Sequence, residues 1–182
     1  ERNSNRLNEI TQDILSLSEI ENNEKNNKLK RNIVDLKKLI DNVEEIILVT
    51  EKVKEIKIIK NYQNAPIPFN GYPNELEKIF TNLLQNSLKF IPNHGRIEIN
   101  IVQNLDKIII EIKDNGPGIN PSNLEKIFER FYTIESSRSK ELSGTGLGLS
   151  IVKHAVNLHD GKIQALSYNH GAHFKITLPI VN

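Results

Sequence analysis

Two apolar runs that alternate with polar residues constrain this chain most strongly. In GRIEINIVQN (95–104) and KIIIEIKD (107–114), isoleucine recurs at every second position, and a short polar turn separates the runs. Because successive side chains of a strand point to opposite faces, the pattern predicts a β-hairpin with one apolar face to cover. NELEKIFTNLLQNSLKF (74–90) predicts a covering helix, whose core face comprises Leu76, Phe80, Leu83, Leu84 and Leu88.

The remaining segments extend this two-layer plan. A strand is predicted at 56–62, and a second hairpin is predicted from 161–168 and 172–180. Helical patterns cover Leu36 to Ile47, the short stretch NLEKIFERF (123–131) and the segment that ends near residue 158. We therefore expect an α+β fold: a two-layer sandwich of a mixed, largely antiparallel sheet covered by about three helices.

The N-terminal segment follows a different pattern. In RLNEITQDILSLSEIE (6–21), the 3-4-3 spacing of Leu7, Ile10, Ile14 and Leu17 predicts a helix that packs on other helices. The polar stretch NNEKNNK (22–28) is interpreted as a linker. The seam is too short for an independent coiled coil, so it is read as the end of a helical hairpin.

Composition narrows the functional class. The chain carries 24 basic and 23 acidic residues, which gives no indication of a nucleic-acid or membrane-surface partner. It holds no cysteine, which excludes disulfides and thiol chemistry, and no apolar run approaches the roughly 20 residues of a membrane span. It also lacks methionine and begins within a helical pattern, so we expect a fragment of a longer protein.

The helix at 74–90 carries the first candidate site. Asn82, Asn86 and Lys89 fall on one stripe away from the apolar face. Asparagine is disfavoured inside helices, because its amide competes for backbone hydrogen bonds, so two of them at this spacing suggest a function. The default alternative is a solvated polar face, since the chain contains 24 asparagines.

A carboxylate after the hairpin is the second candidate. Alternation places Asp114 on the same face as Ile108, Ile110 and Ile112, at the edge of the core. Burial of a carboxylate is costly unless a donor meets it, and the amino group of a ligand would be such a donor. The Asn115-Gly116 pair is equally compatible with an ordinary tight turn.

The third candidate is SGTGLGLSIVKH (143–154), with glycines at 144, 146 and 148 directly before a helix. It lacks the lysine of a Walker loop and the spacing of a dinucleotide fingerprint. A glycine-rich turn that opens a helix favours an anion, because free N–H groups and the helix dipole meet there. A flexible connection is the simpler interpretation of this motif taken alone.

Taken together, the three stretches resemble the ATP-binding domain of sensor histidine kinases, within the wider family of gyrase, mismatch-repair and heat-shock chaperone ATPases. NLLQNSLKF matches the N box, DNGPGI the first glycine box, IFERFY (127–132) the F box and GTGLGLSIVKHAV the second glycine box. The similarity is greatest to phosphate-sensing-type kinases. It implies the C-terminal end of the second dimerisation helix at 1–22, a linker at 23–29 and the ATP-binding domain at 30–182.

The resemblance also implies a role for each matching residue. Asn86 would bind Mg²⁺, Asp114 would accept a hydrogen bond from adenine, and Arg130 would approach the phosphates. Asn86, Lys89 and Arg130 form the implied catalytic set. Nucleotide contacts are implied for Asn82, Asn86, Lys89, Phe90, Asp114, Gly116, Gly118, Ile119, Arg130, Phe131, Gly144, Thr145, Gly146, Leu147, Gly148 and Leu149. The stretch at about 132–143 would be a lid, with Arg138 and Lys140 as further phosphate contacts.

By the same resemblance, ATP and Mg²⁺ are the expected cofactors, and ATP or ADP the bound nucleotide. The γ-phosphate would pass to a histidine on dimerisation helices, and from there to the receiver domain of a response regulator. None of the five histidines stands in the phosphoacceptor motif. The resemblance implies that the full-length protein is a homodimer, and it is compatible with a membrane anchor outside this segment. The segment itself is expected to lie in the cytoplasm, to be a monomer and to bind no nucleic acid.

Three alternatives remain open at this stage. The first is an ATPase of the gyrase or mismatch-repair type, with Glu75 or Glu77 as general base and Glu75 on the polar stripe. The second is a protein-serine kinase of the anti-sigma type. The third is an inactive domain that serves only as an interaction module.

Overall fold

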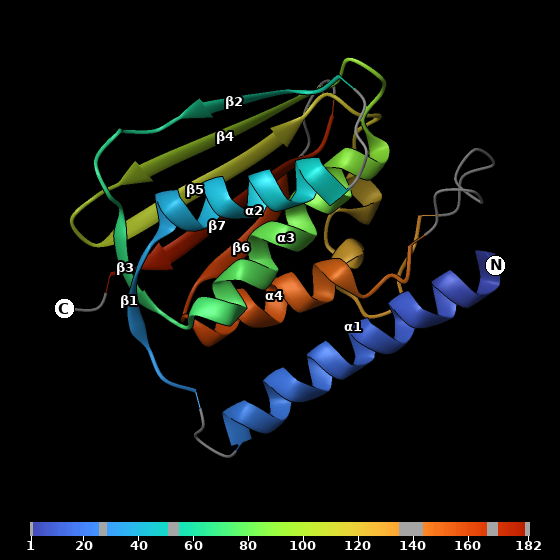
Figure 1. The fold of residues 1–182 in the computed structure, drawn as a ribbon, viewed down its shortest axis with the longest axis horizontal. Coiled ribbons are helices and arrows are strands. Elements are labelled where there is room, and N and C mark those ends of the chain that lie inside the picture. The colour runs from blue at the N-terminus through green and yellow to red at the C-terminus, as the bar shows by residue number, and fades with distance from the viewer. Residues whose placement is uncertain (1, 26–28, 51–54, 135–143, 167–170, 181–182) are drawn as a thin grey trace.

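The computed structural model describes residues 2–25, 29–50, 55–134, 144–166 and 171–180 (Figure 1). Its helices are α1 (Arg2–Lys25), α2 (Leu36–Thr50), α3 (Pro73–Phe90) and α4 (Gly148–Leu158), with the 3-10 turns η1 (Pro121–Asn123) and η2 (Lys126–Phe128). Its strands are β1 (Asn32–Asp35), β2 (Lys57–Asn61), β3 (Pro68–Gly71), β4 (Arg96–Gln103), β5 (Lys107–Asp114), β6 (Lys162–Leu166) and β7 (His173–Pro179).

The described strands form one main sheet in the order β2-β4-β5-β7-β6. β2 runs parallel to β4, and the other neighbouring pairs are antiparallel. The predicted hairpin is β4-β5, in which Ile97 lies opposite Asp114 and Ile101 opposite Ile110. β6 and β7 form the second predicted hairpin. The mixed, largely antiparallel sheet is therefore confirmed.

A separate two-stranded antiparallel sheet, β1-β3, was not predicted. Each of its strands has only four residues, which is too short for a period of two to stand out. Its antiparallel register places Asp35 opposite Pro68, and the N–H of Leu36 at the start of α2 donates to the carbonyl of Ile67 at 2.9 Å.

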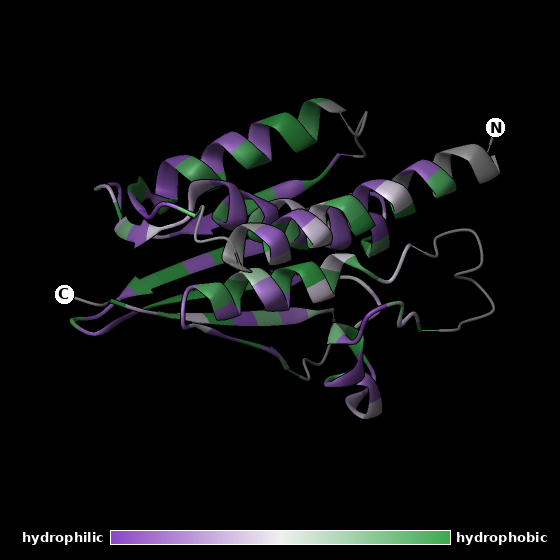
Figure 2. Cartoon of the chain, turned by 90° about the horizontal axis from the view of Figure 1, so that it is seen from below, coloured by the Kyte–Doolittle hydropathy of each residue, from purple (hydrophilic) through white to green (hydrophobic). Residues whose placement is uncertain are grey.

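Helices α2, α3 and α4 lie on one face of the main sheet (Figure 1). Hydrophobic and hydrophilic residues alternate along these elements, as expected where one face lies in the core (Figure 2). Ile97, Ile99, Ile108 and Ile110 of the sheet are fully buried, as are Leu76 and Leu83 of α3. The two-layer sandwich is confirmed, and its apolar interior fixes the orientation of α3, which carries the first candidate residues.

Helix α1 continues to Lys25, into the polar stretch NNEKNNK (22–28) that is the expected linker. Once a helix has formed its first turns, each further polar residue adds a hydrogen bond at little cost. Leu17 and Ile20 are buried in a small cluster with Leu147 and Ile151, whereas Leu7, with 63% of its surface exposed, lies outside that contact. The domain boundaries at 22 and 29 stay a prediction.

The helix expected over 123–131 is absent, and the 3-10 turns η1 and η2 cover this segment instead. Their apolar residues Ile127 and Phe128 are buried against the core. Phe131 ends the segment in the left-handed region, with φ of 64°. A short segment gains too few hydrogen bonds to offset helix nucleation, so its buried side chains decide the backbone path.

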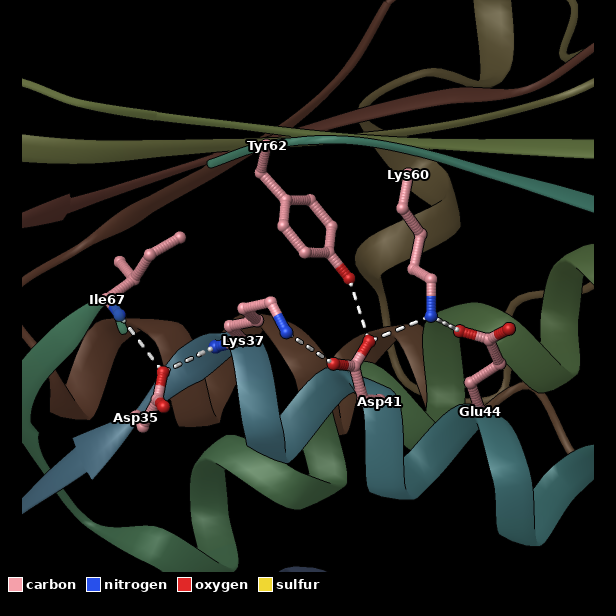
Figure 3. Close-up of polar contacts among 7 residues, drawn as sticks. All are labelled: Asp35, Lys37, Asp41, Glu44, Lys60, Tyr62 and Ile67. Carbon is pink, nitrogen blue, oxygen red and sulfur yellow. Dashed lines mark hydrogen bonds and ion pairs between the residues drawn. The ribbon is translucent and has the colours of Figure 1, made fainter. Parts of the chain in front are cut away.

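Polar contacts fasten the edge strand β2 to α2 (Figure 3). Oδ1 of Asp41 accepts from Nζ of Lys60 at 2.8 Å and from the hydroxyl of Tyr62 at 3.0 Å, and Oδ2 accepts from Nζ of Lys37 at 3.2 Å. Burial opposes the ionisation of Asp41, but these bonds outweigh it and lower the pKa of the carboxyl. Burial, followed by the bond to Asp41, raises the pKa of Tyr62.

Candidate functional site

Helix α3 carries the predicted stripe of Asn82, Asn86 and Lys89, and all three side chains are half-buried. Pro73 opens the helix at a position where its missing N–H costs nothing. The amide nitrogen of Asn82 donates to the carbonyl of Lys78 at 2.8 Å, which leaves the amide oxygen for another contact. None of the described residues forms a hydrogen bond with the side chain of Asn86.

The stripe is not a solvated face along its whole length. Glu75, predicted to lie on it, has only 3% of its surface exposed. Its Oε1 lies 3.3 Å from Nζ of Lys78, and Oε2 is buried without a hydrogen-bond partner. Packing of α3 against α4 covers the side of α3 that the isolated helix would expose. Glu77 is exposed, so the two acidic residues of the ATPase alternative lie in different environments.

Asp114 ends β5 on the core face, as alternation predicts, with 6% of its surface exposed. Its Oδ1 accepts from the N–H of Gly116 at 2.9 Å and from the N–H of Ala172 at 3.0 Å. Its Oδ2 accepts from the hydroxyl of Ser87 at 3.1 Å. These donors supply the compensation that a buried carboxylate needs, and they hold the side chain in one orientation.

Sequence reasoning missed Ser87, Gly171 and Ala172. Ser87 is 1% exposed, and it lies one helical turn after Leu83 on the core face, so a polar residue in an apolar stripe was the available signal. Gly171 has φ of 108°, and a Cβ there would overlap the carbonyl of Asp114. No periodic pattern indicates that residues 171 and 172 pass directly against Asp114.

The first glycine box also needs its glycines for close approach. A Cβ at Gly116 would lie 3.0 Å from Oδ1 of Asp114 and 3.3 Å from the carbonyl oxygen of Phe90. Gly118 has φ of 79°, which disfavours any residue with a side chain. The end of α3 and the turn after β5 therefore meet beside the Asp114 carboxylate.

The second glycine box is placed against the N box. A Cβ at Gly144 would lie 2.9 Å from Nζ of Lys89, and one at Gly148 would lie 2.8 Å from Oδ1 of Asn82. Helix α4 begins at Gly148, and its N-cap residue provides no side-chain cap. The uncapped N–H groups of α4 thus lie next to the amide of Asn82 and near the ammonium group of Lys89, and this arrangement favours binding of an anion.

The F box is joined to the second glycine box through the backbone. The N–H of Phe131 donates to the carbonyl of Gly146 at 2.9 Å. Gly146 has φ of 74°, and a Cβ there would lie 2.6 Å from the carbonyl carbon of Phe131. Residues 131 and 146, which flank most of the expected lid, therefore lie in contact.

The other predicted residues are distributed around this region. Phe90, Arg130 and Phe131 are exposed, whereas Ile119, Thr145 and Leu149 are half-buried. The side chain of Leu147 is fully buried in the cluster with α1, so only its backbone can face a ligand. Arg138, Lys140 and residues 135–143 of the expected lid lie outside the described residues.

Among the described residues, no three His, Cys, Asp or Glu side chains gather closely enough to bind a metal ion. The predicted residues instead bring together the buried carboxylate of Asp114, the amides of Asn82 and Asn86, the ammonium group of Lys89 and the open N-terminus of α4. In the same described part of the chain, no helix has the length and apolarity to cross a membrane.

Residues 71–182 match the family described as histidine kinase-, DNA gyrase B-, and HSP90-like ATPase. The chain is 32% identical over 177 residues to the sensor protein kinase WalK of Staphylococcus aureus, covering 96% of this chain and 42% of that protein. It therefore spans less than half the length of that relative.

Solved structures agree with this assignment. The mycobacterial sensor histidine kinase MprB is 28% identical with a TM-score of 0.69, covering 82% of this chain and 97% of that one. Full-length ShkA, solved in complex with AMPPNP, is 25% identical with a TM-score of 0.71, covering 85% of this chain and 32% of that one. The chain belongs to the family of histidine kinase-, DNA gyrase B- and HSP90-like ATPases, and its fold is that of a histidine kinase catalytic domain.

Proposed function

We propose that this chain is the catalytic domain of a sensor histidine kinase, which binds Mg-ATP and donates the γ-phosphate to a histidine on dimerisation helices. The observation that carries the proposal is the buried Asp114 carboxylate, which lies between α3 and the segment that precedes β7 and is held by three donors. The family match and the relatives named as sensor kinases support the reaction class.

Asp114 is suited to select adenine. An ionised carboxylate offers about four lone-pair positions, and described donors use two at Oδ1 and one at Oδ2. The remaining position at Oδ2 would accept a hydrogen bond from the exocyclic amino group of adenine. Guanine presents a carbonyl oxygen at the corresponding position, which would leave two acceptors facing each other.

The phosphates would lie between α3 and the start of α4. Lys89 and the open N–H groups of α4 supply positive electrostatic potential there, and Asn82 lies against Gly148 at the entrance. Arg130 and Lys89 would neutralise charge on the transferred phosphoryl group, which is most of what such a reaction requires from a protein. The glycines at 144, 146 and 148 let the backbone approach.

Asn86 fits the role of the protein ligand for Mg²⁺. Its side chain has no hydrogen-bond partner among the described residues, and an amide oxygen is a hard ligand of the kind that Mg²⁺ prefers. Mg²⁺ commonly takes one or two protein ligands and completes its shell with water and substrate phosphates. Bound in this way, it would supply charge neutralisation at the phosphates.

The partners follow from the reaction. In the transfer, a bond forms between a histidine nitrogen and the γ-phosphorus while the bond to the ADP oxygen breaks. The accepting histidine would belong to dimerisation helices, and a receiver-domain aspartate would take the phosphate next. We propose that the full-length kinase is a homodimer with this domain in the cytoplasm.

Calorimetric titration with Mg-ADP and a non-hydrolysable ATP analogue tests the proposal, with GTP as the control ligand. We expect binding of both adenine nucleotides, tighter with Mg²⁺ than with EDTA, and no heat from GTP. Asn86→Ala should remove the Mg²⁺ dependence. A folded chain that binds none of these ligands at millimolar concentration would refute the proposal, and steady ATP hydrolysis would favour the ATPase alternative.

A further inference from the structure

Helix α1 lies alongside α4, the helix whose N-terminus faces the proposed phosphate site (Figure 1). Leu17 and Ile20 of α1 are buried against Leu147 and Ile151, and Leu158 packs on the same cluster. The cluster includes Leu147, a residue of the second glycine box. Movement of α1 and movement of the glycine-rich turn are therefore mechanically connected.

The chain that follows α1 is tied to the opposite end of α4. The guanidinium of Arg31 donates to the carbonyl of Leu158 at 3.3 Å and lies 3.1 Å from Oδ2 of Asp160. A cation at a helix C-terminus satisfies terminal carbonyls and interacts favourably with the helix dipole. Thus α1 contacts α4 at Leu147 and Ile151, and Arg31, which follows α1 in the sequence, contacts the C-terminal end of α4.

One polar contact connects α1 directly to the glycine box. The hydroxyl of Thr145 donates to Oδ2 of Asp13 at 2.5 Å. The same hydroxyl oxygen accepts from the N–H of Leu147 at 3.1 Å. Thr145 therefore commits its single proton to α1, and it also occupies an N–H group at the start of α4.

Asp13 places a negative charge at this position, as a bound phosphate would. Its carboxylate is an anion bound to a hydroxyl two residues before the N-cap of α4, where backbone donors and the dipole favour negative charge. A phosphate that approached the same turn would meet a hydroxyl without a free proton and a carboxylate of like charge. Both effects oppose phosphate binding while α1 is docked.

We propose that Asp13 is a regulatory residue of the nucleotide site: docking of α1 through Asp13 and Thr145 opposes binding of the nucleotide phosphates. The inference rests on the proposed function, because it concerns the same site. Displacement of α1 would release the hydroxyl of Thr145 and remove one negative charge from the site. Because coupling is reciprocal, bound nucleotide would weaken α1 docking by the same factor.

The test compares the affinity of a non-hydrolysable ATP analogue, with Mg²⁺, for the native chain, Asp13→Ala, Asp13→Asn and Glu19→Gln. We expect Asp13→Ala to tighten binding on the order of fivefold, at the lower end of typical couplings between sites. Asp13→Asn removes the charge and keeps an acceptor, so its affinity should fall between those of the native chain and Asp13→Ala. Glu19 is exposed on the same helix, and Glu19→Gln removes a like charge without a contact to Thr145.

Amide hydrogen exchange supplies an independent readout. Saturating nucleotide should accelerate exchange of the α1 amides near Leu17 and Ile20 in the native chain. An Asp13→Ala affinity within threefold of native, or weaker than native, would overturn the inference and leave the proposed function intact. If neither chain binds nucleotide in a folded sample, the proposed function fails and this inference fails with it.

Discussion

Replacement of Asp114 by asparagine should separate adenine recognition from folding. In Asp114→Asn the remaining oxygen can keep the Oδ1 position, where it would still accept from the N–H groups of Gly116 and Ala172. The new amide group would take the Oδ2 position and face Ser87, whose hydroxyl can turn from donor to acceptor. The described network therefore survives, with neutral bonds in place of charge-assisted ones.

The amino group of adenine cannot change from donor to acceptor in this way. The amide N–H at the Oδ2 position would face the adenine amino group, so two donors would meet where a charged acceptor stood. Loss of a hydrogen bond to a charged group costs about 1.5–3 kcal/mol, and the unpaired donors add about 1 kcal/mol or more. The dissociation constant should rise by about two to three orders of magnitude.

Titration calorimetry with Mg-ADP, together with thermal unfolding, measures both effects. We expect a fall in Tm of only a few degrees, since about 1 kcal/mol corresponds to about 2–4 °C for a chain of this size. Ser87→Ala is a matched control, because it removes one donor and leaves the carboxylate. Affinity of Asp114→Asn within about threefold of native, in a folded chain, would refute the assignment of Asp114 to adenine.

Further predictions concern the fold. Burial lowers the pKa of His159, whose neutral Nε2 accepts from the N–H of Tyr72 at 2.9 Å. The contribution of neutral His159 to the free energy of unfolding is therefore complete above the unfolded pKa near 6.5, and it declines as the pH falls below that value. Denaturant unfolding at pH 7.5 and 5.5 should show this loss, which should shrink in His159→Gln; equal losses would contradict it. Asp41→Ala should lower the free energy of unfolding by about 1–3 kcal/mol through loss of its three charge-assisted bonds, measured by urea titration. Gly171→Ala should cost at least about 2 kcal/mol, because its Cβ would overlap the carbonyl of Asp114, and an unchanged Tm would contradict the close approach.

The contact between α1 and the glycine box bears on how such a domain is controlled. Because the carboxylate of Asp13 binds the hydroxyl of Thr145, the proposed coupling would make phosphate binding depend on the position of α1 without any change in the core. The apolar contact of Leu17 and Ile20 fixes where α1 lies, and in the proposed coupling the polar contact of Asp13 would link that position to phosphate binding.

Features with a local period were predictable from the sequence. Alternation places every second residue of β5 on the core face, and this placed Asp114 beside Ile108, Ile110 and Ile112, as the structure has it. The apolar face of α3 and the two main hairpins follow from the same kind of counting. Periodicity works there because one layer of helices covers one face of the sheet, so each position is either inside or outside.

Features that depend on contacts between distant segments were decided only by the tertiary structure. Glu75 belongs to the polar side of an isolated helix and is buried because α4 packs there. Two of the three donors at Asp114 come from residues 27 and 58 positions away, and Thr145 meets Asp13 across 132 positions. Periodicity sets which face of an element a side chain occupies. Which partner meets that face depends on how the elements pack, and no local pattern encodes it.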